Sequence, residues 1–440
     1  MPRIYGFSAV PGIQEDLEPD ATPRDVFQLF FTPALWTTMR DETNRYRSQH
    51  PRETSSHMAA WKDVTVEELQ CYMGLRILMG IHNLPEIRHY WSGNRLLGVP
   101  VFQEYMTRDR FDLITSCLHF TDNNDARRGE DRLWKLRTVV DCLQKAFKEV
   151  YVPEREVSVD ESLFRYKGRH HAIQFCPAKR ARFGLKVYKL CASSGPMSGY
   201  TSAFKVYMGQ DRSEVPASMK AVIDLMDAAS LFDKGYTVYT DNWYSSPTLF
   251  HYLQGRRTNA VGTVRTTRKH MPADLKVETK GEVVVRSSKT GQCAVAWKDK
   301  KQVTLLSTIH RGGEKVTLPP NYRGEERTKP LVVHNYNQFM NGVDLSDQLA
   351  SFYHTPRKCK KWYHNLYFHL VDTALVNAHL VYQQNGGRMA PLDFRLALVE
   401  EYLVTPLPPR PQRRGRSSTP RRAPVPEGHH LVSTRNYRRC

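Results

Sequence analysis

Residues 235–246 of this 440-residue chain read GYTVYTDNWYSS, and the rest of the sequence is organised around this stretch. After Gly235, β-branched and aromatic residues alternate as far as Thr240, a pattern typical of a strand bounded by turns. The strand stops at Asp241. A carboxylate at the end of a strand points out of the core, where it either caps the turn or binds a metal ion. Further carboxylates in complementary positions would favour the metal site.

The composition indicates a globular protein with a polyanionic partner. Hydrophobic residues make up 40% of the chain, enough for a substantial core and for two or three domains. Lys and Arg number 64 against 45 Asp and Glu, a formal net charge of +19. Such an excess points most often to nucleic acid, although charge alone leaves heparin-like polymers and anionic membranes open. No apolar run reaches the roughly 20 residues of a membrane-spanning helix, so we expect no membrane partner.

Local patterns divide the chain into segments. Residues 1–25 are polar and contain proline, which predicts a flexible arm. Residues 26–155 carry helical periodicity, as in ELQCYMGLRILMGI, which follows a predicted capping box of Thr65 and Glu68. Residues 156–265 read as strand, strand, strand, helix, strand, helix, strand. This order predicts a central sheet flanked by helices.

A β-rich insertion follows. Residues 266–330 contain short strand patterns, EVVVRSS, CAVAWKD and QVTLLSTIH, among many basic residues. Residues 331–353 return to the sheet domain, and residues 354–405 are again helical. Residues 406–440 form a basic tail rich in Pro, Arg and Ser, whose segment RPQRRGRSSTPRR is typical of nuclear localisation or nonspecific DNA binding, or of a disordered charged tail.

Two further carboxylate positions complement Asp241. Asp160 lies on the first predicted strand of the sheet, and Asp344 lies three residues before Asp347 in NGVDLSDQ, on one face if helical. Clustered carboxylates repel one another unless cations fill the gap, and Mg²⁺ prefers oxygen ligands. Two ions held in this way activate a nucleophile and stabilise a leaving oxygen. Acids in this strand and helix order are those of an RNase H-like nucleotidyl-transferase fold, but spacing alone leaves open three unrelated aspartates that cap turns or pair with Arg or Lys.

Three motifs in a fixed order carry a family resemblance. VDESLFRYKGRH, TDNWYSSPTLFHYL and NGVDLSDQ, with the β-rich insertion between the second and third, resemble the piggyBac transposase family. TVEELQCYMGLRILMGIHNLP and FHLVDTALVNAHLVYQ resemble its helical region. The resemblance implies a mixed fold, α+β or α/β. It consists of an RNase H-like catalytic core with a β-rich insertion, flanked by an all-α dimerisation and DNA-binding domain built from the N- and C-terminal segments.

The resemblance also implies a chemistry. The catalytic and metal-binding triad would be Asp160, Asp241 and Asp344, with Mg²⁺ or Mn²⁺, and Asp347 would be a further metal ligand. The activity would be cut-and-paste DNA transposition at TTAA target sites, with hairpin intermediates on transposon ends, a dimeric synaptic complex and a nuclear location. Members commonly finish in a cysteine-rich zinc-binding domain, whereas this sequence stops at Cys440 without a CxxC pair, so we expect no structural zinc.

Other interpretations stay open. A domesticated DNA-binding protein could retain the transposase fold without transposing. A polysaccharide-active enzyme would explain paired carboxylates but not the extended motifs.

Basic and aromatic residues near the acids are candidates for DNA contacts. Lysine and arginine neutralise phosphates, and tryptophan stacks on an unpaired base. The alternative is a solvated basic loop or helix end, with the tryptophan packed into the core. The predicted DNA-binding residues are Lys167, Arg169, Lys179, Arg180, Arg182, Arg357, Lys358, Lys360, Lys361 and Trp362.

Overall fold

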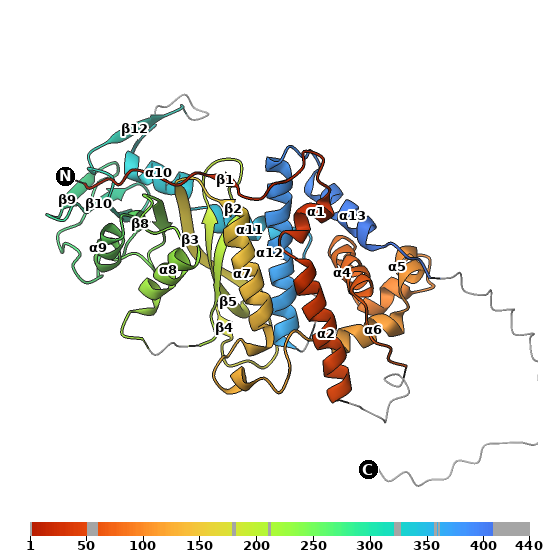
Figure 1. Cartoon of the computed structure of the whole chain (residues 1–440). Helices are drawn as coiled ribbons and strands as arrows, with labels where there is room; N and C mark the ends of the chain where they lie inside the picture. Colours follow the sequence, from red (N-terminus) through yellow and green to blue (C-terminus); the bar gives the residue numbers. More distant parts are fainter. Residues whose placement is uncertain are drawn as a thin grey trace, which may run out of the picture.

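A sheet of nine strands and a group of helices form the two halves of the molecule in the computed structural model (Figure 1). The structure describes residues 2–50, 60–177, 182–209, 213–320, 327–355, 359 and 361–407, except the side chain of Arg127. The strands of the large sheet are β3 (Glu156–Arg165), β4 (Gln174–Phe175), β5 (Phe183–Ala192), β6 (Thr201–Val206), β7 (Thr237–Thr240), β8 (Asn259–Thr263), β9 (Val283–Ser287), β10 (Cys293–Lys298) and β11 (Gln302–Ser307).

The strand order explains the RNase H-like architecture of this half. Along the sheet the order is β4-β5-β3-β7-β8-β11-β10-β9, and β6 pairs with β5. The first strands, β3, β5 and β6, are antiparallel, whereas β3, β7 and β8 run parallel. Parallel neighbours need crossover connections, which here contain α8 (Ala217–Ala228) and α9 (Pro247–Gly255). The predicted order of strand, strand, strand, helix, strand, helix, strand is confirmed, apart from the two-residue strand β4, which was not predicted.

The predicted strands of the insertion are also present, as β9, β10 and β11. They continue the large sheet, because β11 pairs antiparallel with β8, with Leu305 opposite Thr263. A separate antiparallel pair follows, β12 (Lys315–Leu318) with β13 (Arg327–Pro330). The chain then enters α10 (Leu331–Phe339) and α11 (Gly342–Ser351).

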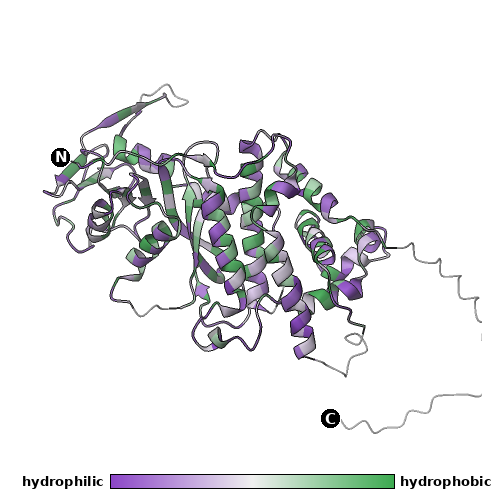
Figure 2. Ribbon diagram, in the orientation of Figure 1, coloured by the Kyte–Doolittle hydropathy of each residue, from purple (hydrophilic) through white to green (hydrophobic). Residues whose placement is uncertain are grey.

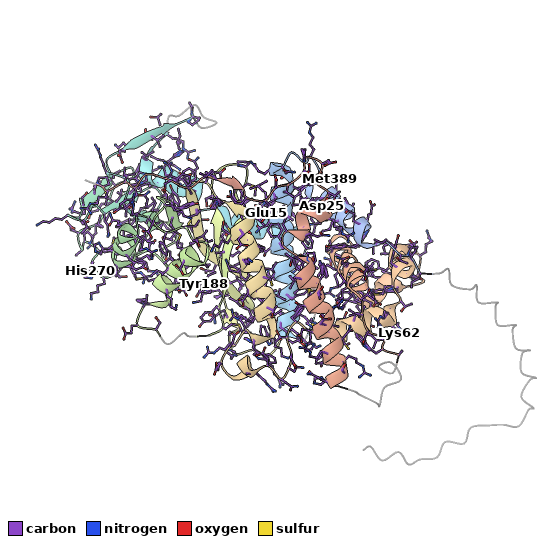
Figure 3. All side chains as sticks on the ribbon, viewed as in Figure 1. Glu15, Asp25, Lys62, Tyr188, His270 and Met389 are labelled. Carbon is purple, nitrogen blue, oxygen red and sulfur yellow. The ribbon has the colours of Figure 1, made fainter. Side chains whose placement is uncertain are left out.

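The helical half combines segments that precede the large sheet in the sequence with segments that follow it. Its longer helices are α1 (Pro23–Gln28), α2 (Pro33–Gln49), α4 (Val66–Ile81), α5 (Pro100–Tyr105), α6 (Arg108–Cys117), α7 (Arg137–Val150), α12 (Trp362–Gln384) and α13 (Pro391–Tyr402). Helix α1 contacts α12 and α13, and α13 packs along α4. Asp25 on α1 and Met389 before α13 accordingly lie at the same end of this half (Figure 3). The prediction that N- and C-terminal segments share one helical region is confirmed.

Helix α12 is the centre of the helical half. Its residues are buried without interruption from Tyr363 to Val381, as expected for a helix covered on all sides. Hydrophobic residues recur along α4 and α12, in the interior of the helical half (Figure 2). No helix in the described ranges combines the length and the hydropathy needed to cross a membrane.

Two local expectations differ from the structure. Thr65 caps α4 by accepting the N–H of Glu68 at 3.2 Å, but Glu68 does not complete a capping box. Its carboxylate instead accepts two hydrogen bonds from Arg110 on α6, both 2.6 Å long. A bidentate, charge-assisted pair is stronger than the bond back to a backbone N–H.

The N-terminal segment, for which the sequence predicts a flexible arm, lies against the sheet. The backbone of Tyr5 exchanges two hydrogen bonds, both 3.0 Å long, with the side-chain amide of Asn259 on β8. Phe7 packs edge-on against Tyr236 with ring centroids 5.0 Å apart. The short strand β1 (Gly12–Ile13) then pairs with β2 (Tyr151–Val152). The polar composition of the N-terminal segment does not predict such contacts, because their partners lie far away in the sequence.

Candidate active site

The register of two parallel strands brings Asp160 and Asp241 together. Strands β3 and β7 pair residue by residue up to Val159 and Thr240. Asp160 and Asp241 are the next residues on the two chains. Neighbouring strands lie about 4.8 Å apart, so the two carboxylates start from adjacent backbone positions at one edge of the pairing.

The turn after β7 orients Asp241. Its Oδ1 atom accepts the backbone N–H of Trp243 at 2.8 Å and that of Tyr244 at 3.4 Å. The Ser245 hydroxyl donates to the Asp241 carbonyl at 2.8 Å. Asp241 therefore does cap a turn. This role does not exclude a metal site, because an ionised carboxylate has about four acceptor positions and the turn uses one of its oxygens.

Helix α11 brings the third predicted acid to the sheet. Gly342 begins the helix so close to the sheet that an added Cβ atom would lie 2.6 Å from Ser193 Oγ and 2.7 Å from Ser158 Oγ. Ser158 and Asp160 share one face of β3, since side chains two apart point the same way. Asp344 lies in the first turn of α11 and is exposed. The helix thus begins against the face of β3 that bears Asp160, and Asp344 lies in its exposed first turn.

Tyr336 on α10 lies close enough to Asp160, Asp241 and Asp344 for the charge of each to affect its pKa. Its hydroxyl lies 3.2 Å from Thr263 Oγ1. Burial raises the pKa of Tyr336 to about 12, and the negative charges of Asp241, Asp160 and Asp344 each add to the rise. Sequence reasoning missed Tyr336, whose only signal is a polar aromatic residue shortly before the motif of Asp344.

Burial and neighbouring negative charge disfavour the ionised form of both strand-end carboxylates. Burial raises the pKa of Asp160, and the charges of Glu161 and Asp241 raise it further, against the N–H of Glu161, which lowers it. Burial also raises the pKa of Asp241, although the N–H groups of its turn lower it. A bound cation would relieve this desolvation and repulsion.

Glu161 is a further acid near Asp160 that was not predicted from the sequence. It follows Asp160 on β3, so its side chain starts on the opposite face. The Tyr244 hydroxyl donates to Glu161 Oε2 at 3.2 Å, and Lys186 Nζ lies 3.7 Å from Oε1. The signal was present in the sequence, in the acid pair of VDES.

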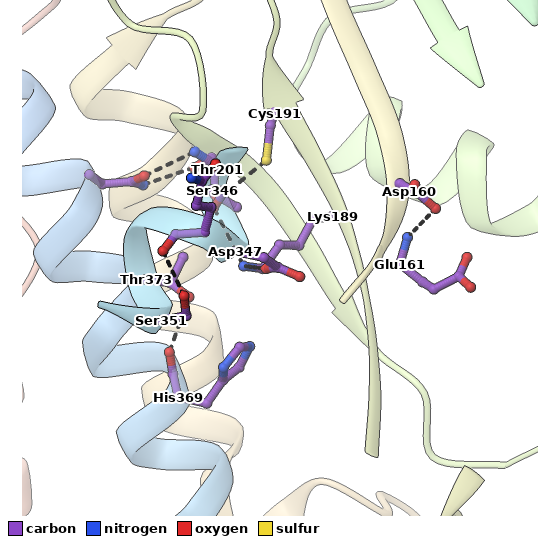
Figure 4. Close-up of polar contacts among 12 residues, drawn as sticks. Asp160, Glu161, Lys189, Cys191, Thr201, Ser346, Asp347, Ser351, His369 and Thr373 are labelled. Atoms are coloured by element: carbon purple, nitrogen blue, oxygen red, sulfur yellow. Dashed lines mark hydrogen bonds and ion pairs between the residues drawn. The ribbon is translucent and has the colours of Figure 1, made fainter. Parts of the chain in front are cut away.

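Asp347 already has a cationic partner. Lys189 on β5 donates to Asp347 Oδ1 at 2.9 Å, and its side chain is 1% exposed (Figure 4). Burial opposes ionisation of Asp347, but the Lys189 ammonium lowers its pKa below the usual value. The sequence offered no signal for this pair, whose members lie 158 residues apart. The role of Asp347 as a metal ligand stays a prediction.

The three predicted acids offer the type of ligand atom that a hard divalent ion prefers. Asp160, Asp241 and Asp344 offer carboxylate oxygens, which Mg²⁺ and Mn²⁺ prefer. Burial is the main reason that the pKa values of Asp160 and Asp241 are raised, and a cation bound between them would offset that effect. As the side chains stand, no three His, Cys, Asp or Glu side chains in the described ranges converge closely enough to hold an ion. A metal site built from the three predicted acids would require movement of their side chains.

The predicted DNA-binding residues lie in four different situations. Lys167, Arg169 and Arg182 are exposed on the segments after β3 and before β5. Lys361 donates to the Ser116 carbonyl at 2.7 Å. The Trp362 ring is half-buried against the helical core, with its centroid 4.9 Å from that of His170. The remaining predicted residues lie outside the described part of the chain: Lys179, Arg180, Arg357, Lys358 and Lys360.

Two exposed phenylalanines lie beside Arg182. Phe175 on β4 and Phe183 on β5 are 59% and 45% exposed, and their ring centroids lie 4.8 Å apart. Phe183 lies six residues before Lys189 on β5, which is about 20 Å along the strand. Sequence reasoning missed this aromatic pair, although the two residues bracket a basic loop, CPAKRAR.

A cavity of about 900 Å³ lies among α7, β6 and α8, and none of the predicted site residues lines it. Several of its charged side chains pair with one another. Lys205 and Lys220 lie 2.7 Å and 2.9 Å from Asp224, and Arg137 lies 2.6 Å from Asp131. We assign it no part in the chemistry.

Comparisons with known proteins agree with the fold. The family model described as Transposase IS4 matches residues 22–379. PiggyBac transposable element-derived protein 2 of Homo sapiens is 29% identical over 84% of this chain and 62% of its own length. PiggyBac transposable element-derived protein 3 of Homo sapiens is 28% identical over 90% of this chain and 69% of its own length. The chain thus spans about 62% of the first of these relatives.

A solved structure, the cryo-EM structure of a piggyBac transposase synaptic complex with hairpin DNA, is also similar. It aligns with a TM-score of 0.78 over 90% of this chain and 83% of that chain, at 24% identity. At this identity the likeness establishes the fold.

Proposed function

The chain belongs to the IS4-type transposase family and is one of its piggyBac-type members, and from this premise we propose that it cuts and joins DNA by metal-dependent phosphoryl transfer. One observation carries the proposal above the others. The parallel register of β3 and β7 sets Asp160 beside Asp241.

In the proposed mechanism Asp160, Asp241 and Asp344 hold the divalent ion, Mg²⁺ or Mn²⁺. When bound, such an ion supplies positive charge that stabilises the oxyanions of phosphoryl transfer. The turn N–H groups hold Asp241 in one orientation. Asp160 and Asp241 are half-buried, which strengthens their attraction for a cation relative to fully exposed carboxylates.

The partner in this proposal is DNA. The formal charge of +19 favours a polyanion, and the structural relative is described as a synaptic complex with hairpin DNA. By analogy we extend transposon ends, hairpin intermediates, TTAA target sites, a homodimer and a nuclear location to this chain.

A second candidate is a domesticated DNA-binding protein that keeps the fold without transposing. The names of the relatives, transposable element-derived proteins, favour it. The Lys189 partner of Asp347 also favours it, because an ammonium beside a predicted metal ligand opposes a second divalent ion.

A strand-joining assay separates the two candidates. The full chain would be mixed with duplexes that have free 3′-hydroxyls and randomised ends, with a supercoiled plasmid, and with Mg²⁺ or Mn²⁺. We expect joined products that require the metal ion, with sequenced junctions enriched in TTAA. Salt-sensitive DNA binding without cleavage or joining would support the second candidate.

The exposed aromatic pair should contribute to binding of unpaired DNA. Changing Phe175 and Phe183 together to Ala is expected to weaken binding to a hairpin with an unpaired loop by about 10-fold or more, since stacking contributes about 1–3 kcal/mol per base. Binding to a blunt duplex should change much less. Fluorescence anisotropy measures both affinities.

The matched control for this pair is Leu96→Ala. Leu96 is 79% exposed and lies in the helical half, so its loss should leave both affinities unchanged. Equal weakening of hairpin and duplex binding by the phenylalanine variant would show that the pair does not stack on bases.

A further inference from the structure

Lys189 is a buried ammonium inside the candidate site. It lies in the middle of β5 and is 1% exposed, while its partner Asp347 is 33% exposed. Its Nζ atom donates to Asp347 Oδ1 at 2.9 Å and to Ser346 Oγ at 3.5 Å (Figure 4). A charged amine is seldom buried without a partner, so the pair is the reason that Lys189 can occupy this position.

The position of Lys189 on the sheet relates it to the predicted triad. In the antiparallel pairing of β3 and β5, Lys189 is directly opposite Asp160. Opposed residues of an antiparallel pair point to the same face, with Cβ atoms about 5 Å apart. The lysine therefore starts beside Asp160 and reaches across to α11, the helix that carries Asp344.

The surroundings of the ammonium are built around it. The Ser346 hydroxyl lies 3.1 Å from Thr201 Oγ1 on β6, which anchors α11 at this point. Asp347 lies about one helical turn after Asp344, so the two acids share a face of α11. The ammonium thus lies between a strand with one predicted metal ligand and a helix with two.

We propose that Lys189 is a built-in cation of this site. Its ammonium occupies the position beside Asp347 that a second divalent ion would take, so the resting chain binds one ion, through Asp160, Asp241 and Asp344. Asp347 binds a metal ion only after Lys189 is displaced. This inference rests on the proposed function, because it assumes that those three acids hold the first ion.

Counting bound Mn²⁺ tests the inference without reference to activity. Electron paramagnetic resonance of free Mn²⁺, titrated against the full chain without DNA, gives the number of ions and their affinities. The wild type is expected to bind one ion. Lys189→Met keeps the length of the side chain and removes its charge. This variant is expected to bind a second ion, with an affinity at least about 10-fold higher than any second binding event seen in the wild type. The double variant with Asp347→Asn should lose that second ion.

Asp347→Asn alone keeps the test decisive if Lys189→Met fails to fold. The inference predicts one bound ion with an affinity within about twofold of wild type, because Asp347 is not a ligand in the resting chain. A 10-fold loss of affinity, or the loss of one ion from two, would overturn it. Circular dichroism confirms that each variant is folded.

The outcomes separate this inference from the proposed function. If wild type and Lys189→Met bind the same number of ions equally well and wild type joins DNA, the inference fails and the proposed function stands. If wild type binds no ion and Lys189→Met gains one, Lys189 does exclude the metal and the proposed function fails. If neither chain binds an ion, both are overturned.

Discussion

Replacing Asp241 with Asn is expected to lower the rates of DNA cleavage and joining by about 10³-fold or more. The loss follows from the several kcal/mol of charge stabilisation that a metal ligand supplies in phosphoryl transfer. The asparagine side-chain oxygen can still accept the N–H groups of Trp243 and Tyr244, so the turn should keep its shape. Affinity for duplex DNA should stay within about twofold, as measured by fluorescence anisotropy.

The same substitution should stabilise the metal-free protein. Burial raises the folded-state pKa of Asp241 above its unfolded value. An acid with a raised pKa loses stability as pH rises, because ionisation is then less favourable in the folded state. The variant should therefore gain about 0.5–2 kcal/mol at pH 8, and the gain should shrink towards pH 4. Urea unfolding at the two pH values measures it.

Asp233→Asn is the matched control. Asp233 precedes β7 and pairs with Arg256 at 2.9 Å at the surface, with its side chain 50% exposed. It should retain full activity. Cleavage by Asp241→Asn at more than a tenth of the wild-type rate would remove Asp241 from the catalytic set.

The second large effect is expected at the start of α11. Gly342→Ala would place a Cβ atom 2.6 Å from Ser193 Oγ and 2.7 Å from the Ala192 carbonyl oxygen. Real Cβ atoms do not approach so closely, so the helix must move away from the sheet. Overpacking of this kind costs about 1–3 kcal/mol. A shift of about 1 Å in Asp344 should lower DNA joining by about 10²-fold.

Gly255→Ala provides the control for this prediction. Gly255 ends α9, and no atom lies within 4 Å of the position of its added Cβ. The same change there should leave stability and joining nearly unaffected. Comparable stability of the two variants, measured by urea unfolding, would mean that α11 is not held against β3 as described.

Much of the fold could be predicted because its signals are local. Strand patterns in the sequence identified β3, β5, β7 and β8, and the order of strands and helices predicted a central sheet flanked by helices. The capping box at Thr65 was only half right, since Glu68 pairs with Arg110. The local sequence indicates which hydrogen bonds a residue can make. Which of the competing partners it bonds depends on the contacts that form in the folded chain.

The acids of the candidate site could be proposed from the sequence, but the residues that surround them could not. Asp160 and Asp241 could be named because each lies where a strand pattern and a family motif coincide. Glu161, Tyr336 and Lys189 were not singled out, since each reads locally as an ordinary strand or helix residue. Their roles depend on what faces them.

The sequence by itself determined the elements, their order and the family, because strand periodicity, turns and motifs are written in neighbouring residues. Only the tertiary structure decided that α11 docks through Gly342 onto β3 and that Lys189 pairs with Asp347. The physical reason is the separation of the partners. An ion pair between residues 158 positions apart forms only when the register of the sheet and the packing of a distant helix bring the two charges together.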